Sequence, residues 1–152
     1  MDDDFRLMCA PLQGLTDAAF RRFHASLAGM GVEYFTPFLR VEHGDVRRRD
    51  LSELTVSLRD EVRLTPQVIF RSDDEFRLLV DAVLSAGYDR VDMNLGCPFP
   101  PQVKRGRGAG MLTRPDVLAE VAESVKSYSG KVSFSVKMRL GVDRVDEWQS
   151  VA

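Results

Sequence analysis

The residues best suited to chemistry are Asn94, Gly96, Cys97 and Pro98, which directly follow a short apolar segment. A thiol just past a buried strand, in a turn shaped by glycine and proline, points into the mouth of a site. Such a thiol can act as a nucleophile, a metal ligand or a proton donor. Most free cysteines are small buried hydrophobes instead, but the glycine-rich loop around Cys97 favours a chemical role. No cysteine or histidine lies at ligand spacing nearby, so no metal site is predicted.

Two cations, Lys137 and Arg139, lie two residues apart in a second apolar segment. On a strand they share one face, and two cations inside a fold need anionic or electron-rich partners. A flavin or a phosphate would serve, and a salt bridge from this pair to Asp92 is the structural alternative. Gln67 stands between apolar neighbours and also needs partners, either the edge of a heterocycle or a nearby backbone.

The elements that must position these residues alternate along the chain. Hydrophobic runs bounded by glycine and proline predict strands; they lie near residues 5–10, 32–37, 65–70, 90–95 and 132–139. Helical spacing predicts helices capped at Thr16-Asp17 and at Ser72, a third that begins at Pro115, and another near Asp146. Residues 40–63 are polar, and we expect a loop with short helical pieces there.

Strands that alternate with helices predict a parallel sheet. No G-x-G-x-x-G segment follows the first strand, which disfavours a dinucleotide-binding domain. Polar residues instead gather at several strand ends, as they do in (β/α)₈ barrels. A barrel of this class needs about 250 residues. The predicted fold is therefore α/β, an incomplete (β/α)₈ TIM barrel of about five strands over residues 1–152.

Composition sets broader limits. The chain is 44% hydrophobic and 29% charged with a formal charge of −2, which fits a globular protein without a bulk attraction to nucleic acid. No apolar run reaches the roughly 18 residues of a membrane span, and the start is acidic rather than signal-like. We therefore expect cytoplasmic residence and free thiols at Cys9 and Cys97. A basic loop, residues 104–110, is expected to be a lid, a phosphate contact or simply exposed.

Taken together, these segments resemble the tRNA-dihydrouridine synthase family. The matching segments occur in family order: residues 10–17 (APLQGLTD) with Phe20 and Arg21, Gln67, residues 94–98 (NLGCP), residues 108–112 (GAGML) and residues 136–141 (VKMRLG). The N-x-G-C-P segment followed by G-A-x-x-L is specific to the family, whereas related flavin barrels carry a first segment of similar composition.

The resemblance implies FMN-dependent reduction of the C5=C6 bond of specific tRNA uridines with NADPH as reductant. The family's base is flipped out of the tRNA to reach the flavin. Cys97 matches the general acid, and Asn94 and Arg139 match substrate-binding positions. Pro11, Leu12, Gln67 and Lys137 match positions that contact FMN.

The resemblance also implies that parts of the family's enzyme lie outside this sequence. The remaining strands, a phosphate-binding segment and a helical C-terminal domain that grips tRNA are absent from residues 1–152, so we expect this piece alone to be inactive. The alternatives are another FMN-dependent TIM-barrel oxidoreductase that acts on a small molecule, or an inactive truncated fragment. The sequence predicts no oligomeric state.

Overall fold

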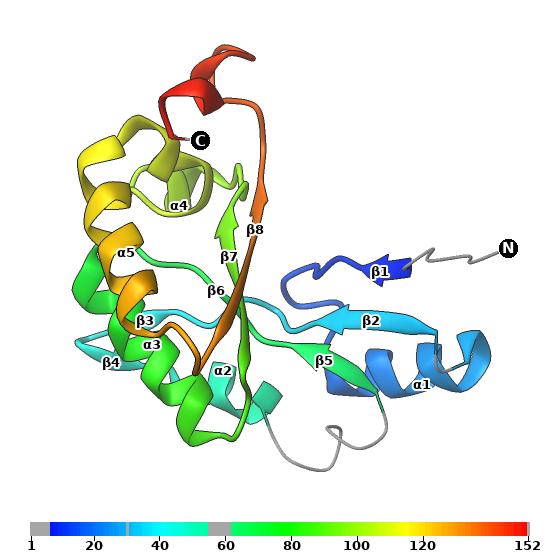
Figure 1. Cartoon of the computed structure of the whole chain (residues 1–152). Coiled ribbons are helices and arrows are strands. Elements are labelled where there is room, and N and C mark those ends of the chain that lie inside the picture. The colour runs from blue at the N-terminus through cyan, green and yellow to red at the C-terminus, as the bar shows by residue number, and fades with distance from the viewer. Residues whose placement is uncertain (1–6, 30, 55–61, 152) are drawn as a thin grey trace, which may run out of the picture.

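The computed structural model describes residues 7–29, 31–54 and 62–151, and it places helices on the outer side of parallel strands (Figure 1). The strands are β1 (Leu7–Cys9), β2 (Val32–Phe35), β3 (Val41–Glu42), β4 (Asp45–Val46), β5 (Arg63–Thr65), β6 (Gln67–Val68), β7 (Arg90–Leu95) and β8 (Ser133–Met138). The α-helices are α1 (Ala18–Ala28), α2 (Arg48–Leu51), α3 (Asp73–Ser85), α4 (Pro100–Val103) and α5 (Pro115–Ser127), and 3₁₀ turns are η1 (Ser52–Leu54), η3 (Gly108–Thr113) and η4 (Glu147–Ser150).

Two parallel sheets carry the fold, with strand orders β1-β2-β5 and β6-β7-β8. The strand predicted at 65–70 is observed as β5 and β6, one on each side of Pro66. Proline has no N–H to donate, but the Pro66 carbonyl accepts from Asp92 N at 2.8 Å, which ties β7 to this segment. The segment therefore joins both sheets, and parallel pairing in chain order is as expected. The described strands do not close into a barrel, and positions 5 and 6 of the predicted first strand lie outside the described residues.

The region predicted as a loop contains a hairpin that the sequence did not indicate. Strands β3 and β4 pair antiparallel, and His43 and Gly44 make the turn with φ of 54° and 84°. Two residues with positive φ match the twist of a tight hairpin. The helical pieces α2 and η1 follow as expected, and residues 55–61 of this region lie outside the described part of the chain.

The helix ends follow the predicted caps. Asp17 Oδ1 accepts from Phe20 N at 3.0 Å, and Ser72 Oγ accepts from Glu75 N at 3.3 Å. Each cap satisfies one N–H of a first helical turn that has no intrahelical partner. Pro115 occupies the first turn of α5, as predicted.

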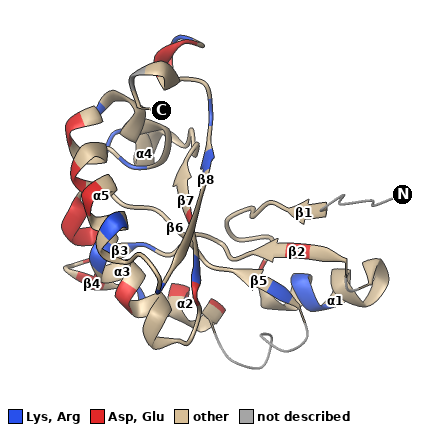
Figure 2. Ribbon diagram, viewed as in Figure 1, with Lys and Arg blue, Asp and Glu red and all other residues tan. Residues whose placement is uncertain are grey.

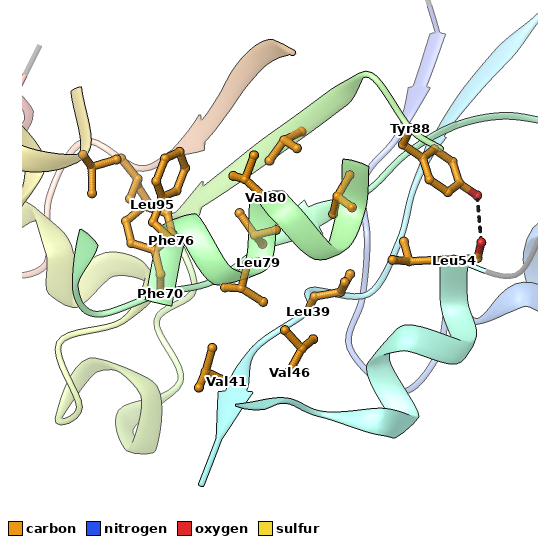
Figure 3. Packing of buried hydrophobic residues seen from close by; sticks show 14 of the residues in the cluster. Leu39, Val41, Val46, Leu54, Phe70, Phe76, Leu79, Val80, Tyr88 and Leu95 are labelled. Carbon is orange, nitrogen blue, oxygen red and sulfur yellow. Dashed lines mark hydrogen bonds between the residues drawn. The ribbon is translucent and has the colours of Figure 1, made fainter. Parts of the chain in front are cut away.

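The main core lies between the second sheet and helices α3 and α5 (Figure 3). Phe76, Leu79 and Val80 of α3 are fully buried because they share the helix face that meets the sheet. Val41 and Val46 bring the β3–β4 hairpin into the same cluster. Acidic residues occur along α3 and α5, whereas the strands carry isolated charges (Figure 2).

Helix α1 behaves differently from the pattern that predicted it. Its apolar positions Phe20, Phe23 and Leu27 are 37%, 67% and 73% exposed, while the one buried residue of the helix is Arg21. The Arg21 guanidinium donates to the Thr16 carbonyl at 2.8 Å and pairs with Glu53 at 2.9 Å. The loop before α1 is thus anchored to η1 by a buried charge rather than by the helix's apolar stripe.

Candidate active site

The predicted site residues Gln67, Asn94 and Lys137 lie on three adjacent strands. Gln67 is in register with Asp92 of β7, and Asn94 is in register with Lys137 of β8. Side chains alternate between the two faces of a strand. Gln67, Asp92, Asn94 and Ser135 hydrogen-bond to one another, so they occupy the sheet face opposite α3 and α5.

These side chains form one continuous hydrogen-bonded chain, which we call the relay (Ser135, Asp92, Gln67 and Asn94). Ser135 Oγ donates to Asp92 Oδ1 at 2.7 Å, and Gln67 Nε2 donates to Asp92 Oδ2 at 2.6 Å. Asn94 Nδ2 donates to Gln67 Oε1 at 2.7 Å. Asn94 Oδ1 then accepts from the backbone N–H groups of Gly96 and Cys97, at 3.1 and 2.9 Å. The relay ends at the backbone of the candidate catalytic cysteine.

Asp92 is 3% exposed within this arrangement. Burial raises the pKa of Asp92, because a charged carboxylate loses its hydration there. Hydrogen bonds from Gln67 and Ser135 and the positive charge of Lys137 act in the opposite direction. The alternative of a close Lys137–Asp92 ion pair is not observed, and each Asp92 oxygen instead accepts one hydrogen bond, from Gln67 and from Ser135.

The loop that carries Cys97 is held from its other side by η3. Ala109 N donates to the Cys97 carbonyl at 3.1 Å. A Cβ at Gly108 would lie 2.8 Å from both the Cβ and the carbonyl oxygen of Cys97, and Gly108 has φ of +58°. Only glycine accommodates both the close approach and this backbone conformation. The G-A-G-M-L segment is therefore the surface on which the Cys97 turn rests.

We expect Gly108→Ala to destabilise the protein by about 2–4 kcal/mol, the sum of an unfavourable positive φ and a steric conflict. Gly130→Ala is the matched control, because Gly130 has φ of +78° but nothing within 4 Å of an added Cβ. The control should cost only about 1 kcal/mol. Urea unfolding of both variants measures the difference, and equal costs would contradict the close packing against Cys97.

The basic residues of the loop 104–110 lie in different environments. Lys104 and Arg105 are exposed, but Arg107 is 3% exposed and its guanidinium pairs with Glu75 of α3 at 2.9 Å. Arg107 Nη2 also donates to the Val41 carbonyl at 2.8 Å. Of the three predicted outcomes for this loop, none describes Arg107, which is a buried structural cation.

A cavity of about 420 Å³ lies between β1 and β8, and residues of β2, β5 and β7 also line it. Pro11 and Lys137 line it, together with Asp92 and Ser135 of the relay. The side chain of Lys137 is exposed there, and within the described residues it makes no hydrogen bond or ion pair. Gln67 is fully buried in the relay and does not line this cavity.

The remaining predicted residues lie around this centre. Leu12 is 60% exposed, and its backbone N–H donates to Thr16 Oγ1 at 2.9 Å. Arg139 follows the end of β8 and lines a separate hollow over residues 139–145. Cys9 packs partly buried against the core, as expected. The structure therefore brings Gln67, Asn94 and the Cys97 backbone into one network, places Pro11 and Lys137 on one cavity, and leaves Leu12 and Arg139 at the periphery.

Asp92 and Ser135 are site residues that sequence reasoning did not select. The signal for Asp92 was present, because Asp92 and Asn94 are two residues apart and alternate with apolar residues in R-V-D-M-N-L, so they share one face of the strand. In the described part of the chain, no group of three or more histidine, cysteine or acidic residues is placed to hold a metal ion. No helix among the described residues is long and apolar enough to cross a membrane.

Parallel strands in chain order with helices on their outer side (Figure 1) are features of a partial (β/α)₈ barrel. Comparison with known proteins supports this fold class and identifies the family within it. The chain belongs to the dihydrouridine synthase family, since the sequence model described as Dihydrouridine synthase (Dus) matches residues 8–152.

Individual relatives support the same assignment. The chain is 33% identical over 143 residues to a probable tRNA-dihydrouridine synthase of Staphylococcus aureus (strain COL), covering 92% of this chain and 42% of the relative. It is 34% identical to probable tRNA-dihydrouridine synthase 2 of Bacillus subtilis (strain 168), covering 92% of this chain and 43% of that protein. The chain thus spans less than half the length of these relatives.

Proposed function

We propose that a full-length protein containing this chain is an FMN-dependent tRNA-dihydrouridine synthase that reduces specific tRNA uridines with NADPH. The observation that supports this most strongly is the Cys97 turn, which Asn94 and η3 hold from two sides beside the strand that carries Lys137. Membership in the dihydrouridine synthase family supports the reaction class. Soluble residence in the cytoplasm, where tRNA is modified, belongs to the same proposal.

The residues that line the cavity between β1 and β8 fit an FMN ring. Lys137 offers a cation without a bonded partner among the described residues, and it lines the same cavity as Ala10 and Pro11. A cation of this kind stabilises negative charge on a reduced flavin. Gln67 is fully buried and does not line the cavity, so it would act on the ring only indirectly, through its bond to Asp92, which does line the cavity. When bound, FMN supplies the hydride equivalent that C6 of uracil accepts.

The chain's own groups then handle the base and the proton. One hydrogen of Asn94 Nδ2 goes to Gln67 Oε1, so Asn94 would bind a uracil carbonyl through the second hydrogen on Nδ2. The Cys97 thiol donates a proton to C5, which completes the saturation of the C5=C6 bond. Arg139, exposed just beyond β8, suits a phosphate or ribose of the tRNA.

The full-length protein should purify with bound flavin and form dihydrouridine in tRNA, whereas residues 1–152 alone should bind FMN weakly or not at all. Lys137→Met in the full-length protein should weaken FMN binding by about 10- to 100-fold, the value of one charge-assisted hydrogen bond. Lys131→Met is the matched control, because Lys131 is an exposed lysine before β8 and away from the cavity.

Flavin absorbance, FMN titration and mass spectrometry of digested tRNA measure these outcomes. A full-length protein without flavin, or one whose flavin reduces a small molecule and leaves tRNA unchanged, would contradict the proposal. Equal loss of FMN affinity in the two lysine variants would remove Lys137 from the site.

A further inference from the structure

The hydrogen bonds of the relay run in one donor-to-acceptor direction, and the shape of the side chains alone does not set this direction. An amide side chain has a donor end and an acceptor end of nearly the same size, so Gln67 and Asn94 could each be turned around without a change in packing. An ionised carboxylate only accepts. Asp92 therefore requires the Nε2 end of Gln67, which leaves Oε1 of Gln67 to face Nδ2 of Asn94.

This direction decides which end of the Asn94 amide faces the Cys97 turn. With Asn94 Nδ2 committed to Gln67, Oδ1 faces the N–H groups of Gly96 and Cys97. A reversed relay would turn Nδ2 of Asn94 toward the same N–H groups, and a donor would then face two donors. A donor facing a donor leaves buried polar groups without partners, which is costly in a site of low polarity.

We infer that Asp92 is a positioning residue for Cys97, which it orients through the amides of Gln67 and Asn94 without contact to the thiol. Burial supports this role, because Gln67, Asp92 and Asn94 are 0%, 3% and 8% exposed and water cannot readily replace their bonds. Ser135 cannot set the direction, since its hydroxyl can donate or accept. The consequence for catalysis rests on the proposed function, whereas the orientation of the turn does not.

Asp92→Asn in the full-length protein tests the inference. An amide at position 92 can offer either its oxygen or its nitrogen to Gln67, because the Ser135 hydroxyl can donate to the one or accept from the other, so position 92 no longer fixes the direction of the relay. Backbone hydrogen exchange at Gly96 and Cys97 should become about fivefold faster, the value of roughly one lost neutral hydrogen bond. Exchange at the Gly29 amide, which caps α1 through Ala25 at 3.0 Å, should not change.

Two further variants separate orientation from general damage. Ser135→Ala removes the other partner of Asp92 but leaves the carboxylate, so exchange at Gly96 and Cys97 should stay at the wild-type rate. Asp92→Asn combined with Gln67→Glu moves the carboxylate to position 67, where it accepts from the amides on both sides. This double variant should restore slow exchange at both positions. Should Asp92→Asn fail to fold, Gln67→Leu breaks the relay at its middle and must also speed the exchange.

Unchanged exchange in Asp92→Asn, equal acceleration in Ser135→Ala, or no restoration in the double variant would each overturn the inference. If the wild-type protein reduces tRNA uridine, Asp92→Asn should lower kcat while the KM for tRNA stays the same. A wild-type protein without that activity would overturn the proposed function and leave the exchange result, and hence the inference, intact.

Discussion

In the full-length protein, Cys97→Ala should keep its flavin and lose uridine reduction by about 10²–10⁴-fold, the contribution of a positioned general acid. The structure makes this substitution specific. Alanine keeps the Cβ that packs against Gly108, and the backbone bonds from Cys97 to Asn94 and Ala109 do not involve the thiol. The turn should therefore retain its conformation, so that the loss reports the missing proton donor.

Cys9→Ala is the matched control for this result. Cys9 lies in β1 and packs against the core, so its removal should cost stability and leave the rate of reduction nearly unchanged. Flavin absorbance and dihydrouridine content measure both variants under single-turnover conditions. A wild-type rate in Cys97→Ala would show that the proton comes from another group or from water.

Arg107→Ala should destabilise the protein by about 3–5 kcal/mol, because it leaves buried polar groups without their partner. Glu75 would keep Arg71, which is 57% exposed and bonds it at 2.8 Å, but would lose the buried guanidinium. The Val41 carbonyl would lose its bond to Nη2. Because Arg107 directly precedes Gly108, we also expect the support of the Cys97 turn to loosen.

Urea unfolding of Arg107→Ala, Glu75→Ala and the double variant measures this pair. The double variant should lose less stability than the sum of the two single variants, since removing both side chains leaves no charge buried without its partner. Lys126→Ala is the control, because Lys126 and its partner Glu123 are 71% and 72% exposed and such pairs contribute about 0–1 kcal/mol. A cost for Arg107→Ala within that range would contradict a buried structural pair.

Several elements were predictable because their causes lie within a few residues. The caps at Asp17 and Ser72 and proline at the start of α5 depend on local backbone geometry alone. The β3–β4 hairpin was missed because strands of two residues have too few alternating positions to show a period. The exposed stripe of α1 shows the limit of periodicity, which reports an apolar face but not what lies against it.

The sequence by itself determined the order of strands and helices, the cap residues and the alternation that puts Asp92 and Asn94 on one face, since each depends on neighbours in the chain. Only the tertiary structure decided which polar groups meet. Gln67 bonds Asp92 and Asn94 from 25 and 27 residues away, and Arg107 reaches Glu75 across 32 residues. Such pairs form because parallel strands bring their ends together and because buried polar groups must find partners, and neither condition is visible in a local stretch of sequence.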